Sequence, residues 1–347
     1  MESVGSDDRI KIVVQMDRRP GYDTSNGDWT GTRRYFVTPD DDPDIIHSTL
    51  LEDMGEVDMG DPNVLREFIE WGKQNYPANR FAVIVWNHGS GWRTASSTSQ
   101  EEDILTKAVS IDDTNGSRIE TGDLPQALDT TPRLDLVAFD ASLMQMTEVV
   151  YETRNTAGVI VGSEESPPGS GYPYHRWLSR LAASPTMSAD SLGTAIVSEY
   201  VDFYAGLREV TQSAIATDRI GDVVTAASQL ADALIPHAVS DAAALASARN
   251  AAESYAFAEY KDLLSYSREV SLRVNDPAVQ AASTALETAL SQAVIYEAHT
   301  GASVADSHGL AIWVPDDTGY AQRRSSYAQL QFAVNSDWDE WLAAQVQ

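Results

Sequence analysis

Two stretches of this chain decide its fold, Phe81-Ala-Val-Ile-Val-Trp-Asn-His-Gly-Ser-Gly-Trp92 and Leu134-Asp-Leu-Val-Ala-Phe-Asp-Ala-Ser-Leu-Met-Gln-Met-Thr-Glu148. Each is an apolar run that ends in small and polar residues, the first at His88 and the second at Asp140-Ala-Ser142. Short apolar runs bounded by turn-forming residues predict buried strands. The carboxyl ends of neighbouring parallel strands open on one edge of a sheet, where ligands bind. We therefore expect His88 and position 142 to lie side by side at that edge.

Other segments extend this pattern into an alternation of strands and helices. Such an alternation predicts an α/β protein whose mostly parallel sheet is covered on both faces. The polar stretch 94–117 is expected to be a long exposed loop. Further strands are expected at Ile10–Asp17, from Thr32, at Val159–Gly162, near Thr211–Thr217 and at His308–Pro315, and helices at 62–75, 121–129, 143–155, over most of 186–295 and at Trp338–Leu342.

Composition limits the class of protein. The 347 residues, 43% of them hydrophobic, suit one or two domains with a large core. The net charge of −28 argues against binding of nucleic acid, which needs clustered cations. Only four of the 24 basic residues are lysines, and an acidic surface with few lysines resembles proteins of haloarchaea; the alternative is an ordinary acidic secreted protein. The absence of cysteine excludes disulfides and zinc–thiolate sites.

Six motifs follow one another along the chain: Gly27-Asp-Trp-Thr-Gly-Thr-Arg-Arg34, Gly55-Glu-Val-Asp-Met-Gly-Asp-Pro62, Trp86-Asn-His-Gly-Ser-Gly-Trp92, Asp140-Ala-Ser-Leu-Met144, Gly162-Ser-Glu-Glu165 and Ser307-His-Gly-Leu310. In this order they resemble the clostripain family of cysteine peptidases, which are relatives of the caspases in clan CD. The resemblance implies a caspase-like three-layer α/β/α sandwich, with the peptidase core in residues 1–185 and a helical extension plus a final strand in 186–347 that completes the same domain. Relatives carry a further strand and helix before the Ile10–Asp17 strand, so we expect a gap in the sheet here or, alternatively, a rearranged sheet.

The resemblance also implies a catalytic dyad. His88 would be the base, position 142 the nucleophile, and the N–H groups of Gly89 and residue 142 the oxyanion site. The family has cysteine where this chain has Ser142, and a serine hydroxyl is far less acidic than a thiol, so we expect cleavage to be crippled. Three explanations stay open: an engineered substitution, a natural inactive homologue and a genuine serine variant. We further expect position 142 to lie at a helix start, which would favour a thiolate.

Specificity is expected to come from an acidic pocket, because family members commonly cut after Arg or Lys. Asp140 would shape that pocket, and the segment Ser163–Tyr174 would form its wall. Relatives often have an acid where this chain has Ser170, so Glu164 or Glu165 would serve instead, or the pocket would prefer another side chain.

Partners and processing follow from the same resemblance. The partner would be a peptide or protein substrate, with no nucleic acid and no membrane span. An active form is expected to cleave itself after Lys107, whereas the chain with Ser142 should remain whole. No cofactor is expected, with calcium as the alternative because some relatives use it. The location would be extracellular or at the cell surface. Two alternatives from other classes are a non-catalytic protein that kept the peptide groove and an acidic structural or adhesion module.

Overall fold

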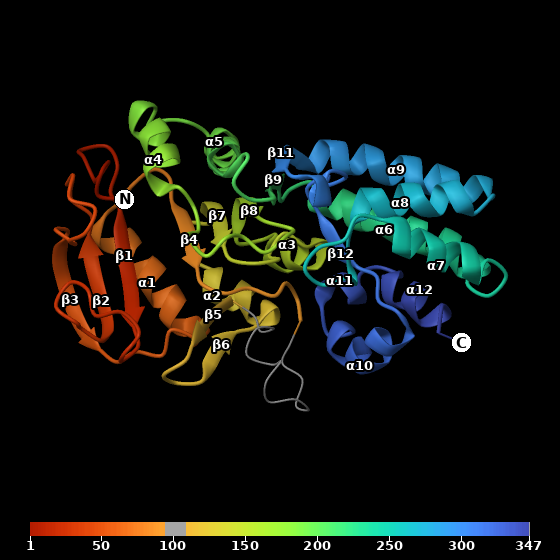
Figure 1. Ribbon diagram of the computed structural model, residues 1–347, viewed down its shortest axis with the longest axis horizontal. Helices are drawn as coiled ribbons and strands as arrows, with labels where there is room; N and C mark the ends of the chain where they lie inside the picture. Colours follow the sequence, from red (N-terminus) through yellow and green to blue (C-terminus); the bar gives the residue numbers. More distant parts are fainter. Residues whose placement is uncertain (94–108, 347) are drawn as a thin grey trace.

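A five-stranded mixed sheet forms the centre of the computed structural model, which describes residues 1–93 and 109–346 (Figure 1). The strand order is β11-β9-β8-β7-β4, in which β4 (Ala82–Trp86), β7 (Leu134–Asp140) and β8 (Ala157–Gly162) are parallel neighbours. The expected α/β class is therefore confirmed. The expectation of a mostly parallel sheet holds only for these three strands, because β9 (Val210–Ala216) and β11 (Val294–Thr300) pair antiparallel.

The reversal at β9 has a topological cause. Two helices, α4 (Tyr174–Ala183) and α5 (Ala189–Tyr204), connect β8 to β9. A single crossover helix would return the chain to the edge at which β8 began and make a parallel pair. Two helices bring it back to the edge at which β8 ended, where Gly162 lies opposite Ser213, so β9 runs in the opposite direction.

Both faces of the sheet are buried. Along β7, Val137 and Phe139 belong to a large hydrophobic cluster on one face, whereas Leu136 and Ala138 belong to a second cluster with side chains of α4 and α5. Successive residues of a strand point to opposite faces, which is why a continuous apolar run predicted this strand. The large cluster also takes in side chains from α3 (Thr147–Thr153), α6 (Ile220–Leu234) and α9 (Pro277–Ala293).

The amino-terminal strands form a sheet of their own. β1 (Val13–Arg18), β2 (Gly31–Phe36) and β3 (Thr49–Gly55) pair antiparallel in that order, with β1 at one edge. β4 is the edge strand of the central sheet, and within the described ranges it pairs only with β7. The sheet expected to join the Ile10–Asp17 strand to β4 is thus divided in two, and Trp86 at the end of β4 is 63% exposed.

Several local predictions need correction. The predicted 94–117 loop contains a hairpin, β5 (Val109–Asp112) with β6 (Ser117–Ile119), while 94–108 lie outside the described residues. The final strand is present as β12 (Ala311–Trp313), but it pairs with β10 (Tyr260–Asp262) and not with the central sheet. Strands β3, β10 and β11 were not predicted at all.

Several of the other helices lie where they were expected, but those at Ala302–Val304, Asp317–Tyr327 and Gln331–Val334 were not predicted. Helix α1 has the predicted bounds because Asp61 caps it, accepting a hydrogen bond from the Asn63 N–H at 2.8 Å, and Pro62 occupies its first turn. None of the described helices is long and apolar enough to span a membrane. The helices not yet given bounds are α1 (Pro62–Asn75), η2 (Thr121–Asp123), α2 (Leu124–Leu128), η3 (Ile235–His237), α7 (Ala242–Ala251), α8 (Leu263–Arg273), η4 (Ala302–Val304), α10 (Asp317–Tyr327), α11 (Gln331–Val334) and α12 (Trp338–Ala344).

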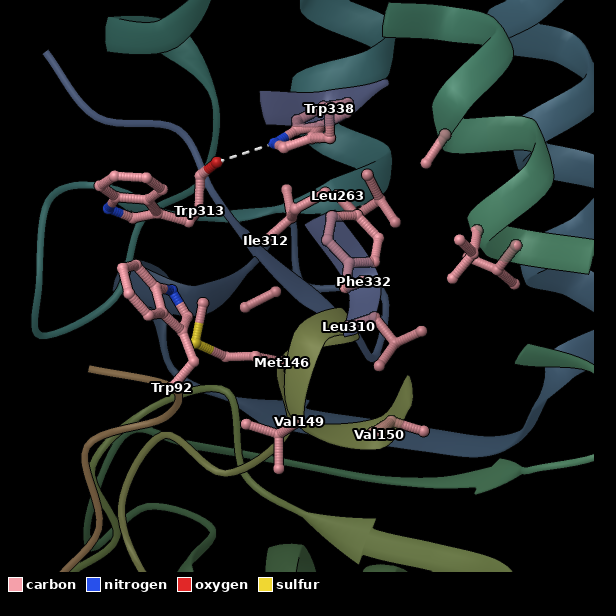
Figure 2. Close-up of a cluster of buried hydrophobic side chains, with 14 of the residues drawn as sticks. Trp92, Met146, Val149, Val150, Leu263, Leu310, Ile312, Trp313, Phe332 and Trp338 are labelled. Atoms are coloured by element: carbon pink, nitrogen blue, oxygen red, sulfur yellow. Dashed lines mark hydrogen bonds between the residues drawn. The ribbon is translucent and has the colours of Figure 1, made fainter. Parts of the chain in front are cut away.

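The carboxyl-terminal half packs its aromatic side chains against the two decisive stretches. Figure 2 shows the rings of Trp92 and Trp313 facing each other, with Met146 beside Trp92 and the Trp338 indole joined to the Trp313 carbonyl by a dashed line. The rings of Trp92 and Trp313 lie edge to face at 4.7 Å between centroids, and the Trp338 indole N–H donates to the Trp313 carbonyl at 3.0 Å. One core therefore joins the strand ends to the extension.

Glu148 is a carboxyl group buried in this core. Its Oε1 accepts hydrogen bonds at 3.0 Å from the Trp313 N–H and from the Tyr327 hydroxyl, whereas Oε2 is buried without a partner within the described structure. Burial disfavours the charged form and raises the pKa of Glu148 to about 7, although the bonds from Trp313 and Tyr327 lower it.

Stability should therefore depend on pH through Glu148. Because its folded-state pKa is raised, its contribution is fully present below the unfolded-state pKa near 4.5 and is lost as pH rises through 7. A shift of this size corresponds to about 3 kcal/mol. We expect Glu148→Gln to gain about 2 kcal/mol over the parent between pH 5.5 and 8.5 in urea unfolding. Glu70→Gln on the exposed face of α1 is the matched control. A gain that did not vary with pH would contradict the assignment.

Candidate active site

His88 and Ser142 follow neighbouring parallel strands at one edge of the central sheet. β4 and β7 are paired so that Trp86 lies opposite Asp140, two residues before His88 and Ser142 respectively. The two chains continue in close contact past the strand ends: a Cβ placed on Gly89 would lie 2.3 Å from the Ser142 carbonyl oxygen and 2.8 Å from its nitrogen. The expected juxtaposition of the two loops is thus observed, and only glycine allows it at position 89.

The His88 side chain is exposed at this edge, whereas Ser142 is partly buried. Among the described residues, neither side chain hydrogen-bonds to another group, so no third residue orients the imidazole. The Gly89 and Ser142 N–H groups likewise donate to no oxygen within the described ranges. The edge therefore presents an imidazole, a hydroxyl and two uncommitted N–H donors.

The segment after Ser142 is a loop and not the helix that was expected. Leu143 has a positive φ of 63°, and its N–H donates to the Glu165 carbonyl at 3.3 Å. The Gln145 N–H donates to the Ser163 carbonyl at 3.1 Å, and α3 begins only at Thr147. The predicted helix start at position 142 is therefore wrong, because backbone bonds to the β8 end replace helical ones. The helix-dipole argument for an anion at position 142 does not apply.

Asn87 anchors the loop that follows β4 and carries His88, which we call the histidine loop (residues 87–92). Its N–H donates to the Asp140 carbonyl at 3.3 Å and its side-chain amide to the Ile111 carbonyl at 3.1 Å. Its side-chain oxygen accepts the His88 N–H at 2.5 Å. Sequence reasoning did not single out Asn87, although its place directly before His88 was a signal that could have found it.

Asp140 lies under the expected pocket wall. Its side chain is 3% exposed and accepts hydrogen bonds at 3.0 Å from the Tyr172 N–H and from the Tyr174 hydroxyl. Burial raises the pKa of Asp140, and the two bonds partly offset that effect. Gly171 passes so close that a Cβ there would lie 2.7 Å from the carboxylate. The two tyrosines were not identified as site residues from the sequence.

The two candidate pocket glutamates lie in different environments. Glu164 is fully buried and its Oε1 accepts a hydrogen bond from Tyr255 at 2.9 Å; burial, with Asp262 nearby, raises its pKa well above the usual range. Its contacts are thus with the extension and not with Asp140. Glu165 is partly buried, and its carboxylate accepts the Ala256 N–H at 3.2 Å.

The other predicted residues of the pocket segment lie along the same loop. The buried Ser163 hydroxyl lies 3.2 Å from that of Thr211, so Ser163 supports the loop from below. Ser170 is exposed near its tip. Lys107, the expected self-cleavage point, lies outside the described residues.

Three carboxylates, from β1, from β5 and from the residue after β3, gather in one cluster. One oxygen from each of Asp17, Glu56 and Asp112 lies within 4.8 Å of the other two. Carboxylate oxygens are ligands that Ca²⁺ accepts. Asp112, however, already accepts hydrogen bonds from the backbone N–H groups of Met59 at 2.9 Å and Asn115 at 3.0 Å, so the cluster is partly satisfied without a cation.

Comparison with known proteins gives consistent results. A family model described as the clostripain family matches residues 1–344. Clostripain from Hathewaya histolytica is 29% identical over 194 residues, which is 50% of this chain and 36% of that protein, so the match spans little more than a third of the relative's length.

Solved structures show the same fold. A secreted C11 cysteine protease from Bacteroides thetaiotaomicron in complex with an irreversible peptide inhibitor has a TM-score of 0.70 at 22% identity, covering 98% of this chain and 92% of that one. An inactive zymogen C11 protease from Parabacteroides distasonis has a TM-score of 0.68 at 20% identity, covering 94% of this chain and 87% of that one.

Proposed function

Because this chain belongs to the clostripain family, we propose that it carries the active-site framework of a cysteine-type endopeptidase and that Ser142 silences it. His88 would be the general base, and residue 142 would supply the nucleophile. The observation that carries this proposal is the contact of the Gly89 backbone with Ala141 and Ser142, which leaves no room for a side chain between the two loops.

The uncommitted N–H groups of Gly89 and Ser142 support the rest of the mechanism. Acyl transfer needs donors aimed at the oxyanion of the tetrahedral intermediate. Two backbone donors on facing loops, beside the nucleophile, suit that task. The imidazole would take the nucleophile's proton and return it to the leaving amine. A serine in place of the thiol would need a firmly oriented base, and His88 has no such partner among the described residues.

A second candidate function is favoured by Ser142 itself. A chain that keeps the groove without the thiol could bind peptides and not cut them. Both candidates are tested by assaying this chain and its Ser142→Cys variant on fluorogenic peptides, with EGTA and with added calcium. Cleavage by the variant alone supports a silenced peptidase. Saturable peptide binding with no cleavage by either supports the binding homologue.

We propose cleavage after Arg or Lys, with Asp140 as the acid that attracts the substrate cation. Asp140 is two residues from the nucleophile position and next to the pocket loop, and no basic side chain pairs with it among the described residues. In the Ser142→Cys background, we expect Asp140→Asn to lower kcat/KM on Arg-ending peptides by about tenfold, because a carboxylate that Tyr172 and Tyr174 cover would attract the substrate cation at a distance and not by direct pairing. Glu165→Gln is the comparison: a large loss there, with none in Asp140→Asn, would move the specificity role to Glu165.

We propose that the protein is halophilic, as haloarchaeal proteins are. Its 52 acidic residues against 24 basic ones repel one another in the folded state. The Debye length falls from about 10 Å at 0.1 M salt to about 3 Å at 1 M. We expect the free energy of unfolding to rise by about 2 kcal/mol or more between 0.1 and 2 M KCl. A thermal melting series checks this, and an unchanged or falling midpoint would contradict it.

The remaining assignments are also proposals. The three-layer caspase-like arrangement is supported by the hydrophobic clusters on both faces of the central sheet. A division into a core over 1–185 and an extension over 186–347 suits the point at which the chain leaves β8 and α4 for the helical half. Secretion is stated for the neighbour from Bacteroides thetaiotaomicron, and an extracellular or cell-surface location is proposed here by analogy.

A further inference from the structure

The histidine loop is contacted from two sides at Gly91, and one of them belongs to the carboxyl-terminal extension. Gly91, three residues after His88, has a positive φ of 65°, and a Cβ there would lie 2.4 Å from Met146 Sδ and 3.1 Å from a ring carbon of Tyr260. The loop is therefore pressed between the segment that follows Ser142 and the ring of Tyr260. One of the two groups that line this position is thus a tyrosine more than 100 residues away in the sequence.

Tyr260 also bonds to this loop. Its hydroxyl donates to the Ser90 carbonyl at 2.8 Å, and both residues are fully buried. The phenol is the one polar group of the extension that reaches the His88–Gly91 backbone within the described structure. Without this donor the buried Ser90 carbonyl would lack a partner among residues 1–93 and 109–346, and an unsatisfied buried carbonyl is costly.

Neighbouring contacts keep Tyr260 in place. β10 pairs Tyr260 opposite Trp313, and the Trp313 ring packs against Trp92 at the end of the histidine loop. The Phe257 ring lies 5.3 Å from that of Tyr260 and also covers the guanidinium of Arg93 at 4.0 Å. Tyr260 is thus part of an aromatic cluster, of which Trp92 and Trp313 are labelled in Figure 2.

We propose that Tyr260 is a positioning residue: its ring and hydroxyl set the backbone of residues 89–91, and through it the placement of His88 and the Gly89 N–H against residue 142. This deepens the proposed function and rests on it for the cleavage reaction. The placement itself, however, can be measured without any substrate. Positioned groups lose much of their effect when displaced by about 1 Å, so the loss of one bond should be visible.

The experiment compares Tyr260→Phe with Tyr266→Phe, each in the Ser142→Cys background. Tyr266 is an equally buried tyrosine of the extension, but it packs against Trp338 in α12, away from the histidine loop. The first readout is the pH dependence of alkylation of the thiol at position 142 by iodoacetamide. A free thiol titrates near 8.5. We expect Tyr260→Phe to move the apparent thiol pKa toward that value by about 0.5 unit or more, and Tyr266→Phe to leave it unchanged.

The second readout is kcat/KM on the peptide cleaved by Ser142→Cys. We expect a fall of about tenfold in Tyr260→Phe and of less than about twofold in Tyr266→Phe. If Ser142→Cys cleaves nothing, the proposed peptidase function fails, while the alkylation profiles still decide the role of Tyr260. Equal alkylation profiles in the two phenylalanine variants, whatever their unfolding midpoints, would overturn the proposal and leave Tyr260 an ordinary core residue.

Discussion

Ser142→Cys is expected to cleave Arg- or Lys-ending peptides about 1000-fold or more faster than the parent chain. A thiol titrates near 8.5, within reach of a neighbouring imidazole, whereas a serine hydroxyl does not ionise near neutral pH. The two side chains are close in shape, so the substitution should leave the loop backbone of residues 142–146 unchanged. The expected gain in cleavage rate therefore comes from the more reactive nucleophile and not from a change in the fold.

Two controls make this result interpretable. Adding His88→Ala to Ser142→Cys should remove most of the gained rate, because His88 is the proposed general base. The assay is run in molar KCl, since the acidic chain is expected to need screening. Equal, background-level cleavage by the parent and the variant would contradict the proposed active site.

Self-cleavage is a second readout of the same variant. After long incubation, Ser142→Cys should be cut after Lys107 into two fragments. These fragments should stay associated under native conditions. The parent should remain whole. Protein that stays intact while peptides are cut would confine the activity to added substrates and refute the self-cleavage prediction.

Gly89→Ala is expected to cost about 1–3 kcal/mol of stability and, in the Ser142→Cys background, about 100-fold in kcat/KM. The new Cβ would lie 2.3 Å from the Ser142 carbonyl oxygen, 2.8 Å from its nitrogen and 3.1 Å from the Ala141 Cβ. Two of these neighbours are backbone atoms and cannot rotate away. The loop that carries His88 must therefore move away from the loop that carries Ser142. That shift displaces the base and one oxyanion donor together.

The matched control is Gly122→Ala, because an added Cβ at Gly122 meets nothing within 4 Å and its φ is not positive. Urea unfolding measures the stability change, and peptide hydrolysis measures the activity change. Full activity in Gly89→Ala would mean that the two loops do not cooperate in catalysis, and the contact between them would then be structural only.

Local signals explain which parts of the fold could be predicted. Helix α1 carries its own cap in Asp61 and its own first-turn proline, so its bounds follow from adjacent residues. Strands β4, β7 and β8 are short apolar runs because both of their faces are covered or nearly so. β3, by contrast, is exposed along almost its whole length. It is held by its pairing with β2, about 20 residues earlier in the chain, so no periodic apolar pattern predicted it.

In the candidate site, too, some features could be predicted from the sequence and others could not. Motif order in the chain was enough to predict that His88 and position 142 meet at one sheet edge, because parallel strand ends must open on the same side. Asp140 was found as a candidate for the same reason. Its shielding by Tyr172 and Tyr174, the burial of Glu164 against Tyr255, and the contact of Tyr260 with Ser90 all join residues that are distant in the sequence.

The sequence by itself determined the α/β class, the paired strand ends and the absence of cysteine, because each of these depends on residue type and on spacing along the chain. Tertiary structure alone decided that Ser142 begins a loop and not a helix, that Glu164 faces the extension, and that Tyr260 holds the histidine loop. These features depend on hydrogen bonds and ring contacts between distant segments, and such contacts exist only once the core has closed around them.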